Sequence, residues 1–533
     1  MTGARAMAAA LRTTLALLLA AGLAAGIAAC GKKGQEIAIV AGSENKELEP
    51  IVQEFCTAQG ATCSFSYKGS LDIGFGLKSK EDPLQADVVW PAASIWVDLF
   101  DEGRKVKHLQ SISQSPVILG VRKSKAEALG WTTHDVTTAD IIAAVQKGEL
   151  KFLMSSATQS NSGAGAYLAM LNTAIGKGDV LTEPDLESAD VRDKARALLG
   201  GVERGSGSSG WLGDLFLDQD QRGVHYQAMW NYEAVLKQTN DALVARGSEP
   251  LWLVYPKDGV AVSDGPLGYL DRGRGSEVET FVLDLQKFLL SDDVQKRIAA
   301  TGRRVGLGRS DAAAPVAAWN FDPSRAITAV RPPEPKVIWA ALNLYQEALR
   351  RPSLTALCLD VSGSMGGKGI DQLHAAMTFL FTPDTTRSML VQWSPDDHIA
   401  LIPFSSAPGI AEQGTGVAGD QARLKEWGLG LEAGGGTDMY ACADQAMRAM
   451  AGDLASGKFL PAIVIMTDGQ SQGDRDGFLA TWRRTNPKVP VFGITFGDAD
   501  RTQLDYLAAE TGGRVFDGRS GLVEAFRAVR GYN

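Results

Sequence analysis

Three short segments of the chain combine oxygen-bearing side chains with glycine, and each adjoins a strand or helix pattern. The apolar run Leu354–Leu359 ends in Asp360-Val361-Ser362-Gly363-Ser364, a D-x-S-x-S sequence. The segment Gly434-Gly435-Gly436-Thr437-Asp438 precedes a helical pattern, and the apolar run Ala462–Met466 ends in Thr467-Asp468-Gly469. Open α/β sheets bind ligands at the carboxyl ends of their strands, where these hydroxyls and carboxylates are expected. A Ser/Gly turn with an aspartate cap could explain the first segment alone, but the other two favour a binding site.

Together these segments resemble the metal-ion-dependent adhesion site of von Willebrand factor A (VWA) domains, and the resemblance covers residues 353–530. It implies a doubly wound, Rossmann-like α/β domain with Mg²⁺ or another divalent cation at the site. The implied metal-site residues are Asp360, Ser362, Ser364, Thr437 and Asp468. By the resemblance, the three hydroxyls coordinate the cation directly, while the two carboxylates act close by, mostly through bound water.

The choice of cation explains the residue types at this site. Mg²⁺ is a small hard ion that takes about six oxygen ligands and keeps water where the protein offers none. Neutral hydroxyl ligands leave such an ion short of negative charge. The resemblance therefore implies a partner protein that completes the shell with the carboxylate of an acidic residue.

Strand patterns rich in Ile and Val also alternate with helical patterns in the first half of the chain. Glu36–Val40 leads into Gly42-Ser43 and a helical pattern, and Ala86–Trp90 leads into another turn. This alternation predicts α/β architecture with parallel strands. The clearest helix begins with a predicted capping box, Ser276-Glu277-Val278-Glu279. Its apolar positions follow the helical period at Val278, Phe281, Val282, Leu285, Phe288 and Leu289.

Several segments of residues 36–309, in their order along the chain, resemble the extracellular solute-binding proteins of ABC importers. The resemblance implies a two-lobed periplasmic-binding-protein type II fold, which the chain would cross at Pro116–Val121 and recross near Tyr255. The segments are Tyr67-Lys68-Gly69-Ser70, Asp87-Val88-Val89-Trp90-Pro91, Ser115-Pro116-Val117-Ile118-Leu119, Asn161-Ser162-Gly163-Ala164-Gly165-Ala166-Tyr167, Asn231-Tyr232-Glu233-Ala234 and Tyr255-Pro256-Lys257-Asp258-Gly259.

Serines at predicted helix starts are the candidates for binding a small-molecule solute in the cleft between two such lobes. They are Ser43, Ser70, Ser94 and Ser162. The unpaired backbone N–H groups of a helix start can hold an anion or a polar substrate. Each serine could instead only cap its own helix, and the lobes could serve only as a scaffold for the second module.

The N-terminus has the pattern of a secretory signal. Two arginines precede the apolar stretch Thr13–Ala25, which is too short to span a bilayer. Small residues then lead to Cys30, an order that resembles the bacterial lipobox, in which the cysteine is diacylated. We expect a signal peptide at 1–29, a tether at 30–35 and a lipid anchor on the extracytoplasmic face of the membrane. The alternative is an ordinary signal peptide that is cut nearby.

The remaining cysteines suit an oxidising compartment. Without Cys30, four of the five cysteines remain, an even number. Cys56 and Cys63 flank a short glycine-containing segment, and we expect a disulfide between them. Cys358 and Cys442 lie inside apolar patterns, where we favour two buried thiols over a second bond.

Length and composition set the frame for these modules. The 533 residues allow three to four domain-sized units at roughly 150 residues each. Hydrophobic residues at 45% and charged residues at 22% are ordinary for soluble globular domains. A net charge of −9 offers no electrostatic footprint for nucleic acid. Residues 310–352 have a linker composition of Ala and Pro followed by a connecting helix, and the domain boundary is expected there.

No catalytic machinery is identifiable in the sequence. The string Gly469–Gly473 fits G-x-S-x-G, but Ser471 stands several residues past the strand end. The last histidine, His398, precedes this serine, so the hydrolase order cannot be completed, and the histidines lack zinc-like spacing. We therefore expect a binding protein and not an enzyme. The alternatives are the solute-binding component of an ABC transporter with an accessory VWA domain, or a recruiter of enzyme subunits as in cytoplasmic chelatases, which the signal peptide disfavours.

Overall fold

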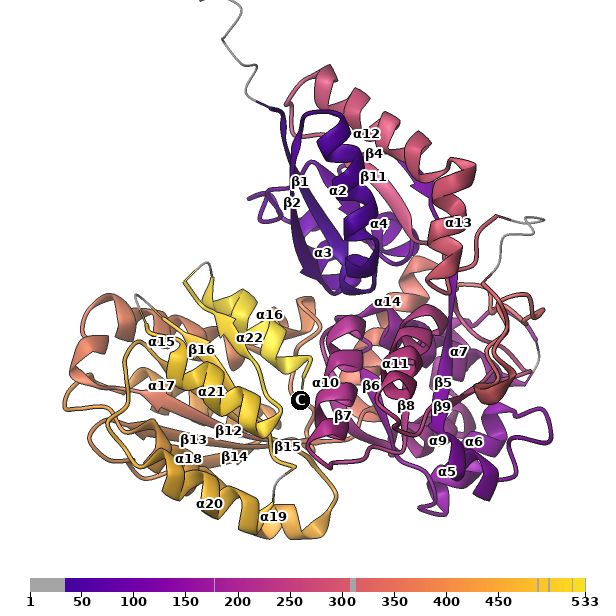
Figure 1. The fold of residues 1–533 in the computed structure, drawn as a ribbon. Coiled ribbons are helices and arrows are strands. Elements are labelled where there is room, and N and C mark those ends of the chain that lie inside the picture. The colour runs from indigo at the N-terminus through magenta and orange to yellow at the C-terminus, as the bar shows by residue number, and fades with distance from the viewer. Residues whose placement is uncertain are drawn as a thin grey trace, which may run out of the picture.

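The structure is a computed structural model, and it describes residues 34–176, 178–306, 313–486, 488–496, 499–519 and 521–532. The predicted signal peptide and Cys30 lie outside these ranges. Among the helices within them, none is both long enough and apolar enough to cross a membrane. Figure 1 shows three bodies, each built on a sheet: two lobes from the first part of the chain and a C-terminal domain.

The first lobe is a five-stranded sheet in the order β2-β1-β3-β11-β4. Its strands are β1 (Glu36–Gly42), β2 (Thr62–Lys68), β3 (Val88–Trp90), β4 (Val106–Ser111) and β11 (Pro266–Leu270). Its helices are η1 (Ser43–Leu48), α2 (Glu49–Ala58), α3 (Ser70–Lys78), α4 (Ile95–Phe100), α12 (Ser276–Leu289) and α13 (Asp292–Ala300). The apolar face expected for α12 is buried in the core of this lobe. The predicted capping box is wrong, because Gly275 is the N-cap and no side chain caps the helix.

The second lobe is a six-stranded sheet in the order β10-β5-β8-β6-β7, with β9 also paired to β5. Its strands are β5 (Ser115–Arg122), β6 (Phe152–Ser155), β7 (Val202–Ser206), β8 (Ala228–Tyr232), β9 (Leu251–Val254) and β10 (Val262–Ser263). Its helices are α5 (Lys123–Ala128), α6 (Thr138–Gln146), α7 (Asn161–Ile175), α8 (Glu183–Glu187), α9 (Ala189–Leu199), α10 (Ser209–Gln221) and α11 (Glu233–Ala245). The chain enters this lobe at β5, as the resemblance implied, and returns between β10 and β11, several residues after Tyr255.

The segment with linker composition is packed onto the second lobe. It contains η2 (Ala317–Trp319), α14 (Pro335–Leu344) and η3, a π-helical turn (Tyr345–Leu349). Trp319 and Phe321 are only 4% and 1% exposed in a core of this lobe, and the hydroxyl of Tyr167 donates to the carbonyl of Ala341 at 2.8 Å. The connecting helix is present as α14, and the part before it is packed although its Ala and Pro content is typical of a linker, because its aromatic side chains bury apolar area.

The C-terminal domain is a sheet in the order β14-β13-β12-β15-β16-β17, parallel except at β14. Its strands are β12 (Ser353–Asp360), β13 (His398–Phe404), β14 (Glu412–Thr415), β15 (Leu460–Thr467), β16 (Val491–Thr495) and β17 (Val515–Asp517). Its helices are η4 (Gly363–Met365), α15 (Lys368–Leu380), α16 (Pro383–Ser388), α17 (Ala418–Leu429), α18 (Met439–Ala449), α19 (Ala451–Ser456), α20 (Arg475–Thr485), α21 (Thr502–Thr511) and α22 (Leu522–Arg530). Helices α18, α20 and α21 pack on one face, and α15, α17 and α22 on the other. The predicted doubly wound α/β architecture is confirmed.

Two disulfides are present in the structure. Cys56 in α2 is bonded to Cys63 in β2, as expected. Cys358 in β12 is bonded to Cys442 in α18, which corrects the preference for two free thiols. The strand and the helix pack in one core, so that the two Cα atoms lie 6.0 Å apart, within the span that a disulfide bridges.

Candidate functional site

The order of the strands brings the three oxygen-bearing loops of the C-terminal domain to one edge of its sheet. Strand β12 runs parallel to both β13 and β15, and Leu359 pairs in register with Met466. The loops that follow β12 and β15 therefore leave the sheet side by side. The glycine-rich loop before α18 is fastened to the first of them, since Gly363 N donates to Gly435 O at 3.0 Å and Gly434 N donates to Val361 O at 2.7 Å.

The side-chain oxygens of the five predicted metal-site residues lie together at this edge. The hydroxyl of Ser364 donates to Asp468 Oδ1 at 2.8 Å, and the hydroxyl oxygens of Ser362 and Ser364 are 3.1 Å apart. A Cβ atom placed on Gly469 would have Ser364 Oγ and Thr437 Oγ1 both at 3.8 Å, so the two hydroxyls face the same small space. Asp360 Oδ1 accepts a hydrogen bond from Ser362 N at 2.8 Å.

These residues differ in burial: two form the buried floor of the site, and three form its solvent-accessible rim. Asp360 and Ser362 are 0% and 1% exposed, Thr437 and Asp468 are half-buried, and Ser364 is exposed. Burial raises the pKa of Asp360, hydrogen bonds from Thr467 and Ser362 oppose this, and the nearby charge of Asp468 raises the pKa further. A cation at this place would relieve the repulsion between the two carboxylates. Three hydroxyls and two carboxylates are oxygen donors of the kind that Mg²⁺ binds, so the residues fit the implied ion.

Further residues hold these loops in place, and the sequence analysis missed them. Ser406 Oγ accepts from Gly436 N at 2.8 Å, and Ser405 O accepts from Asp438 N at 2.8 Å. A hydroxyl pair directly after the apolar strand β13 was the available signal. Ser471 Oγ accepts from Met439 N at 3.1 Å, so this serine fastens the loop after β15 to the start of α18.

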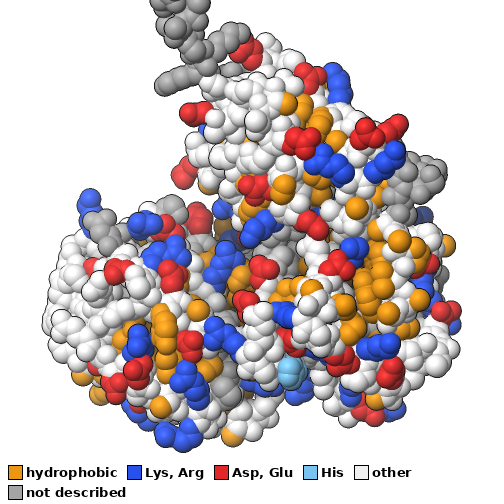
Figure 2. All heavy atoms as spheres, in the orientation of Figure 1, with side chains coloured by type: hydrophobic (Ala, Val, Ile, Leu, Met, Phe, Trp, Pro, Cys, Tyr) orange, Lys and Arg blue, Asp and Glu red, His pale blue; other side chains and the backbone are white. Residues whose placement is uncertain are grey.

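A cavity of about 680 Å³ lies where the two lobes and the C-terminal domain meet. Figure 2 shows the surface indented where these three bodies adjoin. From the first lobe the lining includes Ser43, Glu44, Tyr67 and Asp72, and from the second Gln159, Ser208, Trp211 and Gln238. The C-terminal domain contributes Arg514, Phe516, Ala528 and Tyr532. Aromatic rings beside hydroxyl, amide and charged groups suit a small polar ligand.

Comparison with known proteins identifies both modules. The family model of bacterial extracellular solute-binding proteins matches residues 37–304, half of the chain, and the von Willebrand factor type A domain model matches residues 356–524. The chain belongs to the bacterial extracellular solute-binding protein family. Its C-terminal part is a VWA domain. The two matches identify an extracytoplasmic binding protein built from domain types that are typically non-enzymatic.

Solved structures similar to this chain include members of both groups. The periplasmic binding protein AfuA from Actinobacillus pleuropneumoniae, solved with fructose-6-phosphate, is 16% identical over 51% of this chain and 85% of its own, with a TM-score of 0.38. The ferric binding protein from Campylobacter jejuni is 13% identical over 58% and 98%, with a TM-score of 0.41. A von Willebrand factor type A protein from Catenulispora acidiphila is 20% identical over 35% of this chain and 43% of its own, with a TM-score of 0.29. No curated protein matches the chain.

Of the four serines predicted to bind solute, only Ser43 lines the cavity of the solute-binding domain. Its hydroxyl accepts hydrogen bonds from Ser208 Oγ at 2.6 Å and from Gly210 N at 3.0 Å, and so joins the two lobes. The hydroxyl of Ser70 accepts a hydrogen bond from Ala92 N at 2.9 Å, and the hydroxyl of Ser162 is hydrogen-bonded to Ser155 Oγ at 2.7 Å. Both hydroxyls therefore have partners inside the protein.

Ser94 precedes α4 without a side-chain cap bond, and its backbone N–H donates to Asp264 Oδ1 at 2.9 Å. Ser70, Ser94 and Ser162 do not line this cavity, and helix starts occur throughout an α/β lobe.

Glu44 is a cavity residue that the sequence analysis missed. Burial raises its pKa to about 7, while the charge of Arg303 and a hydrogen bond from Ser209 oppose the shift. Within the described part of the chain, its buried Oε1 has no hydrogen-bond partner. The only signal in the sequence was its position directly after Ser43, at the turn that follows β1.

Proposed function

We propose that this chain is a membrane-anchored extracytoplasmic lipoprotein whose VWA domain binds a protein partner through a divalent cation, Mg²⁺ by preference. One observation supports this function above all. Three loops, distant in sequence, gather three hydroxyls and two carboxylates at the carboxyl edge of one sheet, with Ser364 2.8 Å from Asp468. An ordinary turn would connect these strands and helices with fewer polar groups, so the array favours a binding role over a purely structural one.

In this proposal each residue has a distinct task. Ser362, Ser364 and Thr437 offer hydroxyl oxygens to the cation, and Asp468 at the rim balances its charge. Asp360 lies beneath them and orients the loop through the backbone N–H of Ser362. The cation would supply one bond to the carboxylate of an acidic residue on the partner. Lipid on Cys30 would hold the module at the membrane, and stable anchoring needs two acyl signals.

Calorimetric titration with MgCl₂ tests the metal site directly. We expect Asp468→Ala to lower Mg²⁺ affinity by about tenfold or more, because the metal-site carboxylate is lost. The matched control is Asp476→Ala, an exposed aspartate in α20 whose side chain pairs with Arg475. Equal affinity in wild type and Asp468→Ala would show that the three loops form turns and not a metal site.

A second candidate function is delivery of a small solute to an ABC permease, with the VWA domain as an accessory. The cavity supports it, because its volume of about 680 Å³ and its aromatic and polar lining suit a small polar molecule. Thermal shifts of the full chain across a panel of metabolites test it, with Trp211→Ala as the variant that should lose the response. A panel that leaves the unfolding temperature unchanged would favour lobes that serve only as a scaffold.

A further inference from the structure

The end of the VWA domain reaches the mouth of the cleft between the two lobes. Helix α22 and the residues after it lie beside α10 of the second lobe, where the chain end is marked in Figure 1. We refer to Arg527–Tyr532 as the C-terminal segment. Four VWA residues face the cavity, namely Arg514, Phe516, Ala528 and Tyr532. The cavity therefore has a third wall that neither lobe supplies.

Arg527 contacts both lobes at once. Its guanidinium group forms an ion pair with Asp72 in α3 of the first lobe and lies 4.0 Å from the ring centroid of Phe75 in the same helix. The same group donates to the carbonyl of Thr158 in the second lobe at 3.5 Å. Only 6% of Arg527 is exposed. A buried guanidinium group is costly without its partner carboxylate, so this contact strongly favours the arrangement of the two lobes in this structure.

The rest of the C-terminal segment packs into the second lobe and the cavity. The side-chain amide of Gln159 donates to the carbonyl of Arg527. The ring of Tyr532 stands edge-on to Trp211, with 4.6 Å between centroids, and its hydroxyl accepts a hydrogen bond from Arg514 at 2.9 Å. A Cβ atom placed on Gly531 would meet the side-chain amide of Gln159, so this amide lies directly against the backbone of the C-terminal segment. These contacts make the segment a fitted part of the cavity wall.

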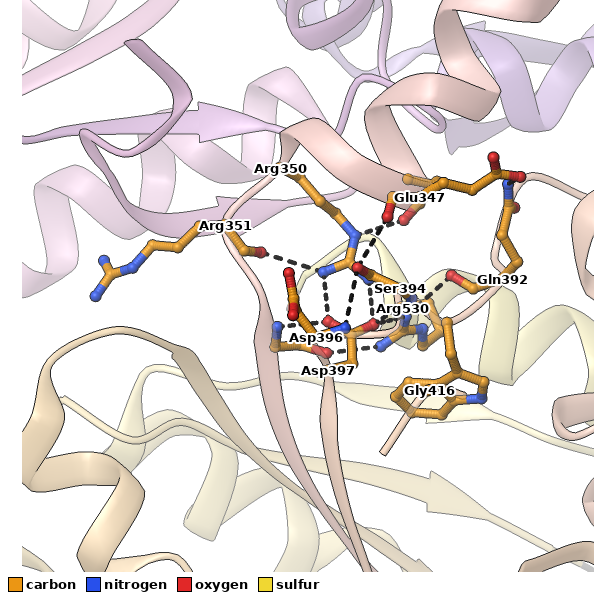
Figure 3. A network of polar contacts seen from close by, with 12 residues as sticks. Glu347, Arg350, Arg351, Gln392, Ser394, Asp396, Asp397, Gly416 and Arg530 are labelled. Atoms are coloured by element: carbon orange, nitrogen blue, oxygen red, sulfur yellow. Dashed lines mark hydrogen bonds and ion pairs between the residues drawn. The ribbon is translucent and has the colours of Figure 1, made fainter. Parts of the chain in front are cut away.

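A buried ion network fastens α22 to the VWA domain, as Figure 3 shows. Asp397, which is 0% exposed, accepts hydrogen bonds from Arg350 at 2.9 Å and from the backbone N–H groups of Ser353 and Ser394 at 2.7 and 2.8 Å. Arg530 of α22 lies 3.4 Å from the same carboxylate. Burial alone would raise the pKa of Asp397, but the two guanidinium groups hold it below its usual range. The C-terminal segment must therefore move together with the VWA domain.

We propose that the C-terminal segment is a latch: it completes the wall of the solute cavity and holds the two lobes together. A bound solute then contacts both modules, and solute binding is coupled to the position of the VWA domain. The proposal rests on the proposed function only for what enters the cavity. The contacts that hold the lobes together form in the chain without ligand, so this part of the proposal does not depend on the solute.

A charge swap between Asp72 and Arg527 tests the latch in the full chain. In small-angle X-ray scattering without ligand, we expect Asp72→Arg and Arg527→Asp each to raise the radius of gyration by about 1 Å or more, against about 24 Å for a compact chain of this length. The double variant restores the ion pair with its charges exchanged and should recover most of the wild-type value. The control is Arg448→Asp, which breaks an exposed pair with Asp444 inside the VWA domain.

The latch and the proposed function can be tested separately. Unchanged radii in both single variants, or a double variant as expanded as the singles, would overturn the latch. Far-ultraviolet circular dichroism excludes unfolding as the cause of expansion, and Arg527→Ala serves as a milder variant if a reversal does not fold. Mg²⁺ titration of the same proteins reports on the metal site alone, so that either proposal can fail while the other stands.

Discussion

The proposed metal site draws all its oxygens from one edge of one sheet, whereas the proposed solute cavity takes its walls from three bodies. Each metal-site residue stands within a few residues of a strand end or a helix start, and the parallel order of β12 and β15 brings these loops together. The cavity depends instead on how the VWA domain docks. A site within one sheet can be predicted from local motifs, while a site between bodies depends on contacts that have no motif.

The largest expected effect concerns the two disulfides, which belong to the two sides of this comparison. In the chain-entropy picture, the Cys358–Cys442 bond closes 84 residues and contributes about 4.5 kcal/mol, while the Cys56–Cys63 bond closes 7 and contributes about 2.4 kcal/mol. Replacing Cys358 and Cys442 with serine should therefore lower the free energy of unfolding by about 4.5 kcal/mol, which is about 2 kcal/mol more than replacing Cys56 and Cys63. Chemical denaturation of both double variants measures the difference, and equal losses would contradict it.

The buried ion network of Figure 3 is the next test, because it joins the VWA sheet to the helix that reaches the cavity. Asp397→Ala leaves Arg350 and Arg530 buried without their carboxylate and should cost about 3–5 kcal/mol of unfolding free energy. Asp396→Ala, at the exposed neighbouring position, is the matched control. A loss below 1 kcal/mol, as for an exposed ion pair, would mean that α22 is not fastened by this network.

Much of the fold, and the location of the metal-site loops, could be predicted from the sequence. The strand patterns before Asp360 and Asp468 end one residue before β12 and β15 end, because a buried parallel strand is apolar until it meets the polar edge. The packing of residues 313–334 could not be predicted, since Ala and Pro dominate a segment whose buried side chains include Trp319 and Phe321. Nothing in the sequence indicated that Arg527 contacts both lobes, because its partners Asp72 and Thr158 lie more than 360 positions earlier in the chain.

Mg²⁺ should stabilise the VWA side of the molecule through mass action. At a concentration of 100 times its dissociation constant, the ion adds about 2.7 kcal/mol to the free energy of unfolding. The double variant Ser362→Ala with Ser364→Ala removes two hydroxyls and should lose most of this gain, whereas Ser388→Ala, exposed on α16, should keep it. Thermal denaturation with and without MgCl₂ measures the gain. If wild type and both variants gain the same stability from MgCl₂, the stabilisation does not come from this site.

The smallest expected effect lies in the cavity and concerns Glu44. Its pKa in the folded chain is about 7, above the ordinary value of 4.5, because the carboxyl group is buried. The folded state therefore holds the proton to higher pH than the unfolded state does, and the free energy of unfolding should fall as pH rises from about 4.5 to 7. Between pH 5 and 7 the fall should amount to about 2 kcal/mol.

Glu44→Gln keeps the shape and an acceptor for Ser209 but cannot ionise, so this fall should be absent from its stability profile. Glu54→Gln, on the exposed side of α2 and paired with Arg297, should retain the wild-type profile. Urea denaturation at a series of pH values measures all three proteins. If Glu44→Gln follows the wild-type curve, the carboxyl group is solvated when the lobes are closed. The cavity would then be an open groove. Glu44 would be as accessible to solvent as the residues at the exposed edge of the proposed metal site, and the two sites would no longer differ in this respect.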